Sequence, residues 1–250
     1  MCLLTFYPEG ILLETGALMN GAEFNNDGHG FAIVTQHHII VWHCMDARLA
    51  VDTFARTRTK YPDGPAIFHS RFGTHGSVGL RNCHPFRVGG DARTVLAHNG
   101  ILPSSVQPAK GDTRCDTRIA AEDFLPGSPF GSLGSRRNRE RLARWLGPSN
   151  KLVVLTIDPR YRRNAYILNE ESGIWDGGVW YSNSDYREPF IDSLDDYWCF
   201  ECHTFEVDPV TGMCTECGAC RDCGERPGHC FCYQPAKFPA PDEQDFLPSR

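Results

Sequence analysis

Eight cysteines lie within 34 residues near the end of the chain, and no other feature restricts the possible fold as strongly. They form four closely spaced pairs, namely Cys199, Cys202, Cys214, Cys217, Cys220, Cys223, Cys230 and Cys232. Four thiolates are the ligand set of a tetrahedral structural zinc ion, so eight thiols account for two zinc sites. Because so short a segment has little apolar core, we expect the two ions to supply its folding free energy.

The division of these ligands between the two ions stays open from the sequence. The first two pairs could share one ion, alternate pairs could interleave, and His203 or His229 could replace a cysteine. An iron-sulfur cluster is the weaker alternative because the spacings differ from those of ferredoxins. Disulfides are disfavoured because the sequence shows no export signal, which predicts a cytoplasmic protein with reduced thiols.

The composition of the chain changes after about residue 190. Before this point short apolar segments alternate with turn formers, and after it the sequence becomes rich in cysteine. We therefore expect one sizeable domain over residues 2–190 and a Cys-rich zinc-binding module over residues 196–233. Residues 234–250 contain four prolines and several acids, which predicts a disordered tail.

Segments rich in β-branched or aromatic residues and bounded by turn formers predict eight strands. They cover residues 2–6, 30–33, 39–43, 66–71, 94–98, 151–157, 165–169 and 179–182. Helical composition predicts three helices, over residues 47–58, 116–124 and 136–146. Because the strands outnumber the helices and occur in groups, the sequence favours a layered α+β sandwich.

Charge and hydropathy restrict the possible partners. The formal net charge of −6 gives no general attraction to nucleic acid, so nucleic-acid binding is not indicated. The arginine-rich stretch 136–144 could contact RNA or DNA, but a solvated helix face is the favoured interpretation. No apolar run approaches the roughly 20 residues that cross a bilayer, so no membrane association is expected.

The second residue, Cys2, is a candidate nucleophile. Removal of Met1 would leave its thiol beside a free α-amine, with ordinary pKa values of about 8.5 and about 8. One residue would then supply both a nucleophile and a base. Taken by position alone, Cys2 reads better as the start of a buried strand, because free cysteine is among the most buried residue types.

Further motifs reverse this preference. His-Ser-Arg-Phe-Gly-Thr-His-Gly covers residues 69–76, Asn-Cys-His-Pro-Phe covers 82–86, His-Asn-Gly covers 98–100 and Arg-Cys-Asp-Thr-Arg covers 114–118. With an N-terminal cysteine, this ordered set resembles the class II glutamine amidotransferases over roughly residues 2–185. The resemblance implies the four-layer αββα sandwich of N-terminal nucleophile hydrolases and L-glutamine as the substrate.

The resemblance also assigns roles to single residues. It implies that Arg71 binds the α-carboxylate of glutamine through two charge-assisted hydrogen bonds and that Asp116 binds the α-ammonium. It implies that the Asn99 side chain and the Gly100 backbone N–H form the oxyanion hole. Other residues matching positions that line the family's glutamine pocket are Thr74, His75 and His84. His69 and His98 are expected to support the pocket.

The expected function is hydrolysis of glutamine through a Cys2 thioester, with ammonia supplied to an acceptor enzyme and no cofactor for the chemistry. Because no acceptor motif follows residue 190, we expect the acceptor to be a separate polypeptide, with the zinc module as its candidate docking site. One alternative is an N-terminal-cysteine hydrolase of another γ-glutamyl amide. Another is a zinc-binding adaptor whose amidotransferase-like domain is not catalytic.

Overall fold

The computed structural model describes residues 2–187, 199–204, 206–208, 211–230 and 232. The chain divides into two compact units, Met1–Arg187 and Glu188–Arg250. The tail predicted over residues 234–250 lies outside the described residues. Among the helices that the structure describes, none has the length and apolar character needed to span a membrane.

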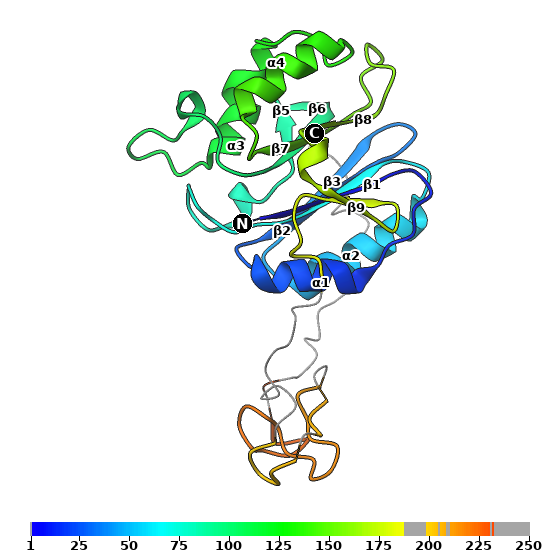
Figure 1. Ribbon diagram of the computed structural model, residues 1–250, viewed down its shortest axis with the longest axis vertical. Helices are drawn as coiled ribbons and strands as arrows, with labels where there is room; N and C mark the ends of the chain where they lie inside the picture. The colour runs from blue at the N-terminus through cyan, green and yellow to red at the C-terminus, as the bar shows by residue number, and fades with distance from the viewer. Residues whose placement is uncertain (1, 188–198, 205, 209–210, 231, 233–250) are drawn as a thin grey trace. The chain divides into compact units, whose positions relative to one another are not determined.

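The first unit contains a six-stranded antiparallel sheet with strand order β3-β2-β4-β1-β10-β9 (Figure 1). Its strands are β1 (Leu3–Tyr7), β2 (His29–Val34), β3 (Ile39–Cys44), β4 (Ala66–Ser70), β9 (Ile174–Asp176) and β10 (Val179–Tyr181). Side chains of a strand alternate between its two faces. In β1, Leu4 and Phe6 accordingly face one apolar core, whereas Tyr7 packs against Phe54 of a covering helix.

A second antiparallel sheet has the order β5-β6-β7-β8. Its strands are β5 (Phe86–Val88), β6 (Asp91–Asn99), β7 (Lys151–Thr156) and β8 (Ala165–Leu168). Val95, Ala97 and Val153 of this sheet join Leu4 and Ile67 of the first sheet in one buried apolar cluster. The two sheets therefore stack face to face, with a shared core between them.

Helices cover the outer faces of both sheets, as Figure 1 shows. The first sheet is covered by α1 (Thr15–Phe24) and α2 (Ala47–Lys60). The second sheet is covered by α4 (Arg136–Leu146) and by the helical segment formed by α3 (Asp116–Ile119) and the π-helical turn Ala120–Phe124. Short 3₁₀ turns occur at Leu80–Asn82, Ser104–Val106, Leu125–Gly127 and Glu170–Ser172. The predicted four-layer αββα sandwich is confirmed.

Each of the eight predicted strands is present, and no end is displaced by more than three residues. Helix α1 and strands β5 and β9 were not predicted from the sequence. Helix α1 has two glycines and no side-chain cap, so its sequence carries a weak helical signal. It forms because Leu18 and Ala22 are buried and because Gly21 has no side chain, which allows its backbone to lie against Leu3.

Strand register positions the candidate nucleophile. Leu3 pairs with Ser70 in the antiparallel ladder between β1 and β4. Cys2 precedes Leu3 and Arg71 follows Ser70, so the ladder brings these two residues opposite each other at one edge of the sheet. In the facing sheet, strand β6 ends at Asn99, which is followed by Gly100.

Candidate functional site

Most of the residues singled out by the motifs line one small cavity of the first unit. Its volume is about 20 Å³. Its lining contains Cys2, Arg71, Phe72, Thr74, His75, His84, His98, Gly100, Cys115, Asp116 and Thr117. Asn99 is not part of this lining, although it adjoins Gly100 and is buried. Segments far apart in the sequence thus meet at one site.

The Cys2 thiol lies against the backbone of Phe72. Its Sγ accepts a hydrogen bond from the Phe72 N–H at 3.3 Å and lies 3.4 Å from the Phe72 carbonyl oxygen. Burial raises the pKa of Cys2, while the Phe72 hydrogen bond and the Arg71 charge act in the opposite direction without cancelling it. The thiol is therefore protonated near neutral pH, and deprotonation needs a base close to the sulfur.

Arg71 is buried, and its guanidinium is held by the loop that follows it. Its Nη2 donates to the His75 carbonyl at 2.7 Å, and its Nη1 donates to the Ser77 carbonyl at 3.3 Å. Asp27 fixes the start of this loop, because its carboxylate accepts the Gly73 N–H at 2.7 Å. Among the described residues, carbonyl oxygens are the only partners of its two terminal nitrogens, so this buried cation is suited to binding a carboxylate. Within the same loop, Thr74 Oγ1 and His75 Nδ1 lie 3.3 Å apart.

Asp116 lies at the start of α3, and its carboxylate is anchored by backbone groups. Oδ2 accepts the Leu102 N–H at 2.8 Å, and Oδ1 accepts the Thr117 N–H at 2.6 Å. A carboxylate has about four acceptor positions, so these bonds leave capacity for a further donor. Asp116 can therefore bind an ammonium group in the cavity while its orientation stays fixed.

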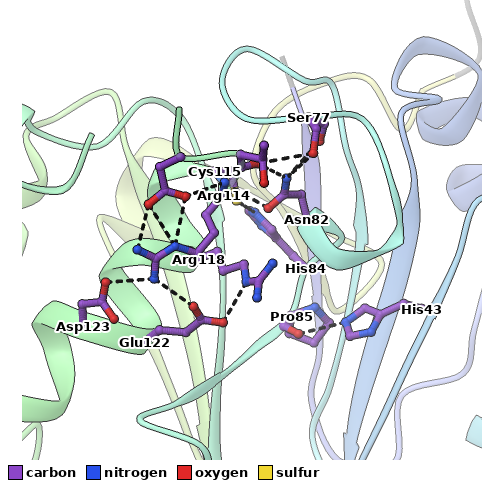
Figure 2. A network of polar contacts seen from close by, with 12 residues as sticks. His43, Ser77, Asn82, His84, Pro85, Arg114, Cys115, Arg118, Glu122 and Asp123 are labelled. Carbon is purple, nitrogen blue, oxygen red and sulfur yellow. Dashed lines mark hydrogen bonds and ion pairs between the residues drawn. The ribbon is translucent and has the colours of Figure 1, made fainter. Parts of the chain in front are cut away.

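A polar network connects the segment carrying Asp116 to the segment carrying His84 (Figure 2). The Asn82 side chain accepts the Cys115 N–H at 3.0 Å and donates to the Thr113 carbonyl at 2.7 Å. Arg114 adds ion pairs to three carboxylates outside the cavity, from Asp112, Glu122 and Asp123. This network was not predicted, although the asparagine belongs to the Asn-Cys-His-Pro-Phe motif. It holds two distant parts of the cavity wall together.

Buried histidines support the cavity. Desolvation lowers the pKa of His69 to about 3 and lowers that of His84 well below its ordinary value. The His69 and His84 rings stack with centroids 4.0 Å apart. His98 Nε2 bonds to Asn150 Oδ1 at 2.9 Å, and its Nδ1 bonds to Thr117 Oγ1 at 3.0 Å. These rings are neutral at pH 7 and well suited to packing and neutral hydrogen bonding.

Gly100 has a conformation that requires glycine. Its φ of +134° lies in a region that residues with a Cβ rarely adopt, and a Cβ would overlap Asn150 Oδ1. The Asn99 side chain donates to Ser182 Oγ at 2.7 Å. An amide nitrogen carries two hydrogens, and Ser182 is the one partner of this nitrogen among the described residues, which leaves a second hydrogen free to donate.

Ser182 was predicted only as the end of a strand, but the structure gives it a central position. Besides the Asn99 amide, its Oγ accepts the Leu4 N–H at 2.9 Å. The adjacent Asn183 donates to the Cys2 carbonyl at 3.0 Å. Together these residues connect Cys2 and strand β1 to Asn99, a residue of the candidate oxyanion hole. No sequence pattern separated them from ordinary turn residues.

In the second unit, the eight cysteines gather into two groups of four. One consists of Cys199, Cys202, Cys214 and Cys217, and the other of Cys220, Cys223, Cys230 and Cys232. Within each group the four Sγ atoms lie within 4.8 Å of one another. Each group can therefore hold one metal ion, and consecutive pairs share a site rather than interleave.

Three turns of the second unit repeat one backbone pattern, beginning at Cys199, Cys214 and Cys220. In each, the carbonyl of the first cysteine accepts the N–H four residues later, from His203, Gly218 or Gly224. The three residues that donate these N–H groups have φ between +58° and +75°. Such a turn brings both thiols of a Cys-x-x-Cys pair to the same side. It explains the glycines after two of the pairs, while His203 adopts the same conformation with a side chain.

No family model matches the chain. A curated relative, the probable glutamine–fructose-6-phosphate aminotransferase (isomerizing) of Schizosaccharomyces pombe, is 34% identical over 96 residues, covering 33% of this chain and 14% of that protein. The predicted resemblance to class II glutamine amidotransferases is confirmed by this match. The match takes in a small part of the relative's length.

Three solved structures are also similar, each over 72% of this chain. Glutamine phosphoribosylpyrophosphate amidotransferase from B. subtilis has a TM-score of 0.45 at 14% identity, over 41% of that chain. An allosteric regulatory enzyme of purine biosynthesis has a TM-score of 0.39 at 15% identity, over 41% of its chain. A glutamine aminotransferase class-II domain protein from Silicibacter pomeroyi has a TM-score of 0.32 at 15% identity, over 87% of its chain.

Proposed function

We propose that this protein is a glutamine amide hydrolase in which Cys2, after removal of Met1, is the nucleophile. The observation that carries the proposal is the meeting of Cys2, Arg71, Gly100 and Asp116 at one cavity. A guanidinium and a carboxylate in one small site complement the carboxylate and ammonium of a free amino acid. The similarity to an aminotransferase named for glutamine supports the same substrate.

In the proposed mechanism the Cys2 thiol gives its proton to its own α-amine and attacks Cδ of glutamine. Burial raises the pKa of the thiol, so a base close to the sulfur assists its deprotonation. Negative charge develops on the former amide oxygen, where the Asn99 side chain and the Gly100 N–H donate hydrogen bonds. Losing one such donor typically costs about 3 kcal/mol of barrier. Ammonia leaves with a proton from the amine, and water then cleaves the γ-glutamyl thioester to give glutamate.

Glutamine binding requires the loop after Arg71 to move. The cavity of about 20 Å³ has room for roughly one water molecule. Arg71 donates to carbonyls of that same loop, at His75 and Ser77. A substrate carboxylate would replace these carbonyls as the partner of the guanidinium, and displacement of the loop would open the space.

The two cysteine groups are proposed to bind one zinc ion each, with a structural role. Four thiolates suit zinc, and the clustered Sγ atoms of each group support the assignment. We further propose that ammonia passes to a separate acceptor enzyme in the cytoplasm and that the second unit docks this enzyme. If deleting residues 196–250 leaves the acceptor bound in a pull-down, the docking role is wrong.

The test of the hydrolase proposal combines intact-mass analysis with kinetics. We expect the purified protein to lack Met1, to be alkylated once by a glutamine-mimicking diazoketone, and to release ammonia from glutamine. The Cys2→Ala variant should be neither alkylated nor able to release ammonia, and Cys44→Ala is the matched control because Cys44 does not line the cavity. Faster hydrolysis of γ-glutamyl dipeptides than of glutamine would favour the alternative amide substrate. An unmodified Cys2 would favour the adaptor.

A further inference from the structure

Arginines gather on the first unit around the turn that connects β7 to β8. Residues 134–166 contain nine Lys or Arg and two Asp or Glu, in a chain with a formal net charge of −6. A cavity of about 310 Å³ lies within this region, lined by Gly134, Arg139, Arg160, Arg162, Arg163 and Tyr166. It shares no lining residue with the Cys2 cavity.

Two of the four arginines are held in place. Arg139 donates to the Leu133 carbonyl at 2.7 Å, and its guanidinium lies 5.7 Å from the centroid of the Tyr166 ring. The buried Asp158 carboxylate accepts the backbone N–H of Arg160 at 3.0 Å and its Nη2 at 2.7 Å. The arginine side of the cavity is therefore organised before any ligand arrives.

The other two arginines carry uncompensated charge. Arg162 and Arg163 are exposed and make no hydrogen bond or ion pair within the part of the chain that the structure describes. Asp158 is the carboxylate paired with the cavity arginines there, through Arg160. Four guanidinium groups and one carboxylate leave an excess of about three positive charges around one hollow. Guanidinium groups bind phosphate oxygens in bidentate fashion.

A second cavity adjoins the first, because Arg160 lines both. It has a volume of about 300 Å³, and its lining includes the apolar side chains of Val88, Leu96, Phe130 and Leu133. The lining also contains Asp91, whose carboxylate forms an ion pair with Arg93. An arginine-lined hollow beside an apolar one fits a ligand with a multiply charged head and an uncharged organic body.

We infer that these neighbouring cavities bind an organic diphosphate, with the diphosphate among the arginines and the organic group in the apolar cavity. Concavity favours this ligand over nucleic acid. Arg139 lies on the buried side of α4 with Leu142 and Leu146, whereas Arg137 and Arg141 are exposed elsewhere on the helix. The cavity arginines therefore converge on one hollow instead of forming an extended stripe.

Calorimetric titration of the full, zinc-loaded chain tests the inference. The probes are adenosine diphosphate, geranyl diphosphate, inorganic pyrophosphate and a single-stranded RNA. We expect saturable binding of at least one organic diphosphate, tighter than that of pyrophosphate. Arg162→Gln combined with Arg163→Gln should weaken it about tenfold or more. The control pairs Arg137→Gln with Arg141→Gln, which removes the same charge outside the cavity and should leave the affinity within about twofold.

Three results would overturn the inference. The first is that neither organic diphosphate binds saturably. The second is equal weakening in both double variants, because that pattern indicates general charge attraction. The third is preferential binding of RNA that depends on Arg137 and Arg141, which would identify an extended polyanion surface. Both variants replace exposed side chains, so unchanged melting temperatures verify that they remain folded.

Discussion

Replacing Ser182 with alanine tests how the candidate oxyanion hole is held in position. The Ser182 hydroxyl accepts the Asn99 side chain at 2.7 Å and the Leu4 N–H at 2.9 Å, and both contacts are buried. Alanine removes the acceptor for both donors while leaving the backbone unchanged. Asn99 then loses the contact that fixes its amide, and β1 loses a connection two residues from Cys2.

The expected cost follows from the two donors left without a partner. Each buried, unsatisfied donor costs about 1–3 kcal/mol, so the free energy of unfolding should fall by about 2–4 kcal/mol after partial relaxation. For a protein of this size, that corresponds to a melting temperature lowered by roughly 4–16 °C. Complete loss of the Asn99 donor would raise the barrier by about 3 kcal/mol. Partial misplacement should therefore lower kcat by about tenfold to a hundredfold.

The assay is ammonia release from glutamine over a range of concentrations, with Thr5→Val as the matched control. Thr5 is also buried, and its hydroxyl donates to the Phe68 carbonyl at 3.1 Å. Both variants should be less stable, but only Ser182→Ala should lose kcat. KM should change little, because Arg71 and Asp116 are not altered. Equal kcat losses in the two variants, or a loss confined to KM, would refute the positioning role.

Three further predictions concern the same molecule. Gly100→Ala should lower kcat about tenfold or more and destabilise the fold by about 1–3 kcal/mol, because a side chain at φ +134° would displace Asn150; retained activity with normal melting would contradict this. Desolvation lowers the pKa of His29 to about 4 and that of His69 to about 3. Both side chains therefore stay neutral in the folded state at pH values where they gain protons in the unfolded state. The free energy of unfolding should therefore be greatest above pH 6.5 and fall as the pH drops from about 6.5 toward 4. The fall should be up to about 1.4 kcal/mol per pH unit for each histidine. A urea midpoint independent of pH over this range would refute that reasoning. Chelation should release two zinc ions per chain and expose the thiols of Cys199–Cys232 to a thiol-reactive dye, while glutamine hydrolysis persists. A chain that purifies without metal would contradict the zinc assignment.

The sequence predicted the layered fold well because strand periodicity and turn formers are local signals. β7 was expected over residues 151–157 and runs over Lys151–Thr156, and α4 has the bounds that its composition predicted. Helix α1 was missed because it depends on burial against β1, which local composition does not report. The short strand β9 was missed because it forms by pairing with β10 at the edge of the sheet.

Motif wording named most of the residues that line the candidate cavity, but not the contacts that support them. Cys2, Arg71 and Asp116 stand in recognisable segments, so their types and order were visible in the sequence. Ser182 and Asn82 act through contacts with residues 83 and 33 positions away in the chain. Such pairings depend on how the two sheets stack, and a single sequence does not encode that arrangement in any readable local pattern.

The pairing of Leu3 with Ser70 has a consequence for how this chain tolerates change. A strand advances about 3.4 Å per residue and turns its side chains to the opposite face at each step. An extra residue inserted after Cys2 would therefore push the sulfur beyond reach of Arg71, even though no atom of the cavity wall had been altered. The number of residues before β1 is consequently as restrictive as the chemical identity of Cys2.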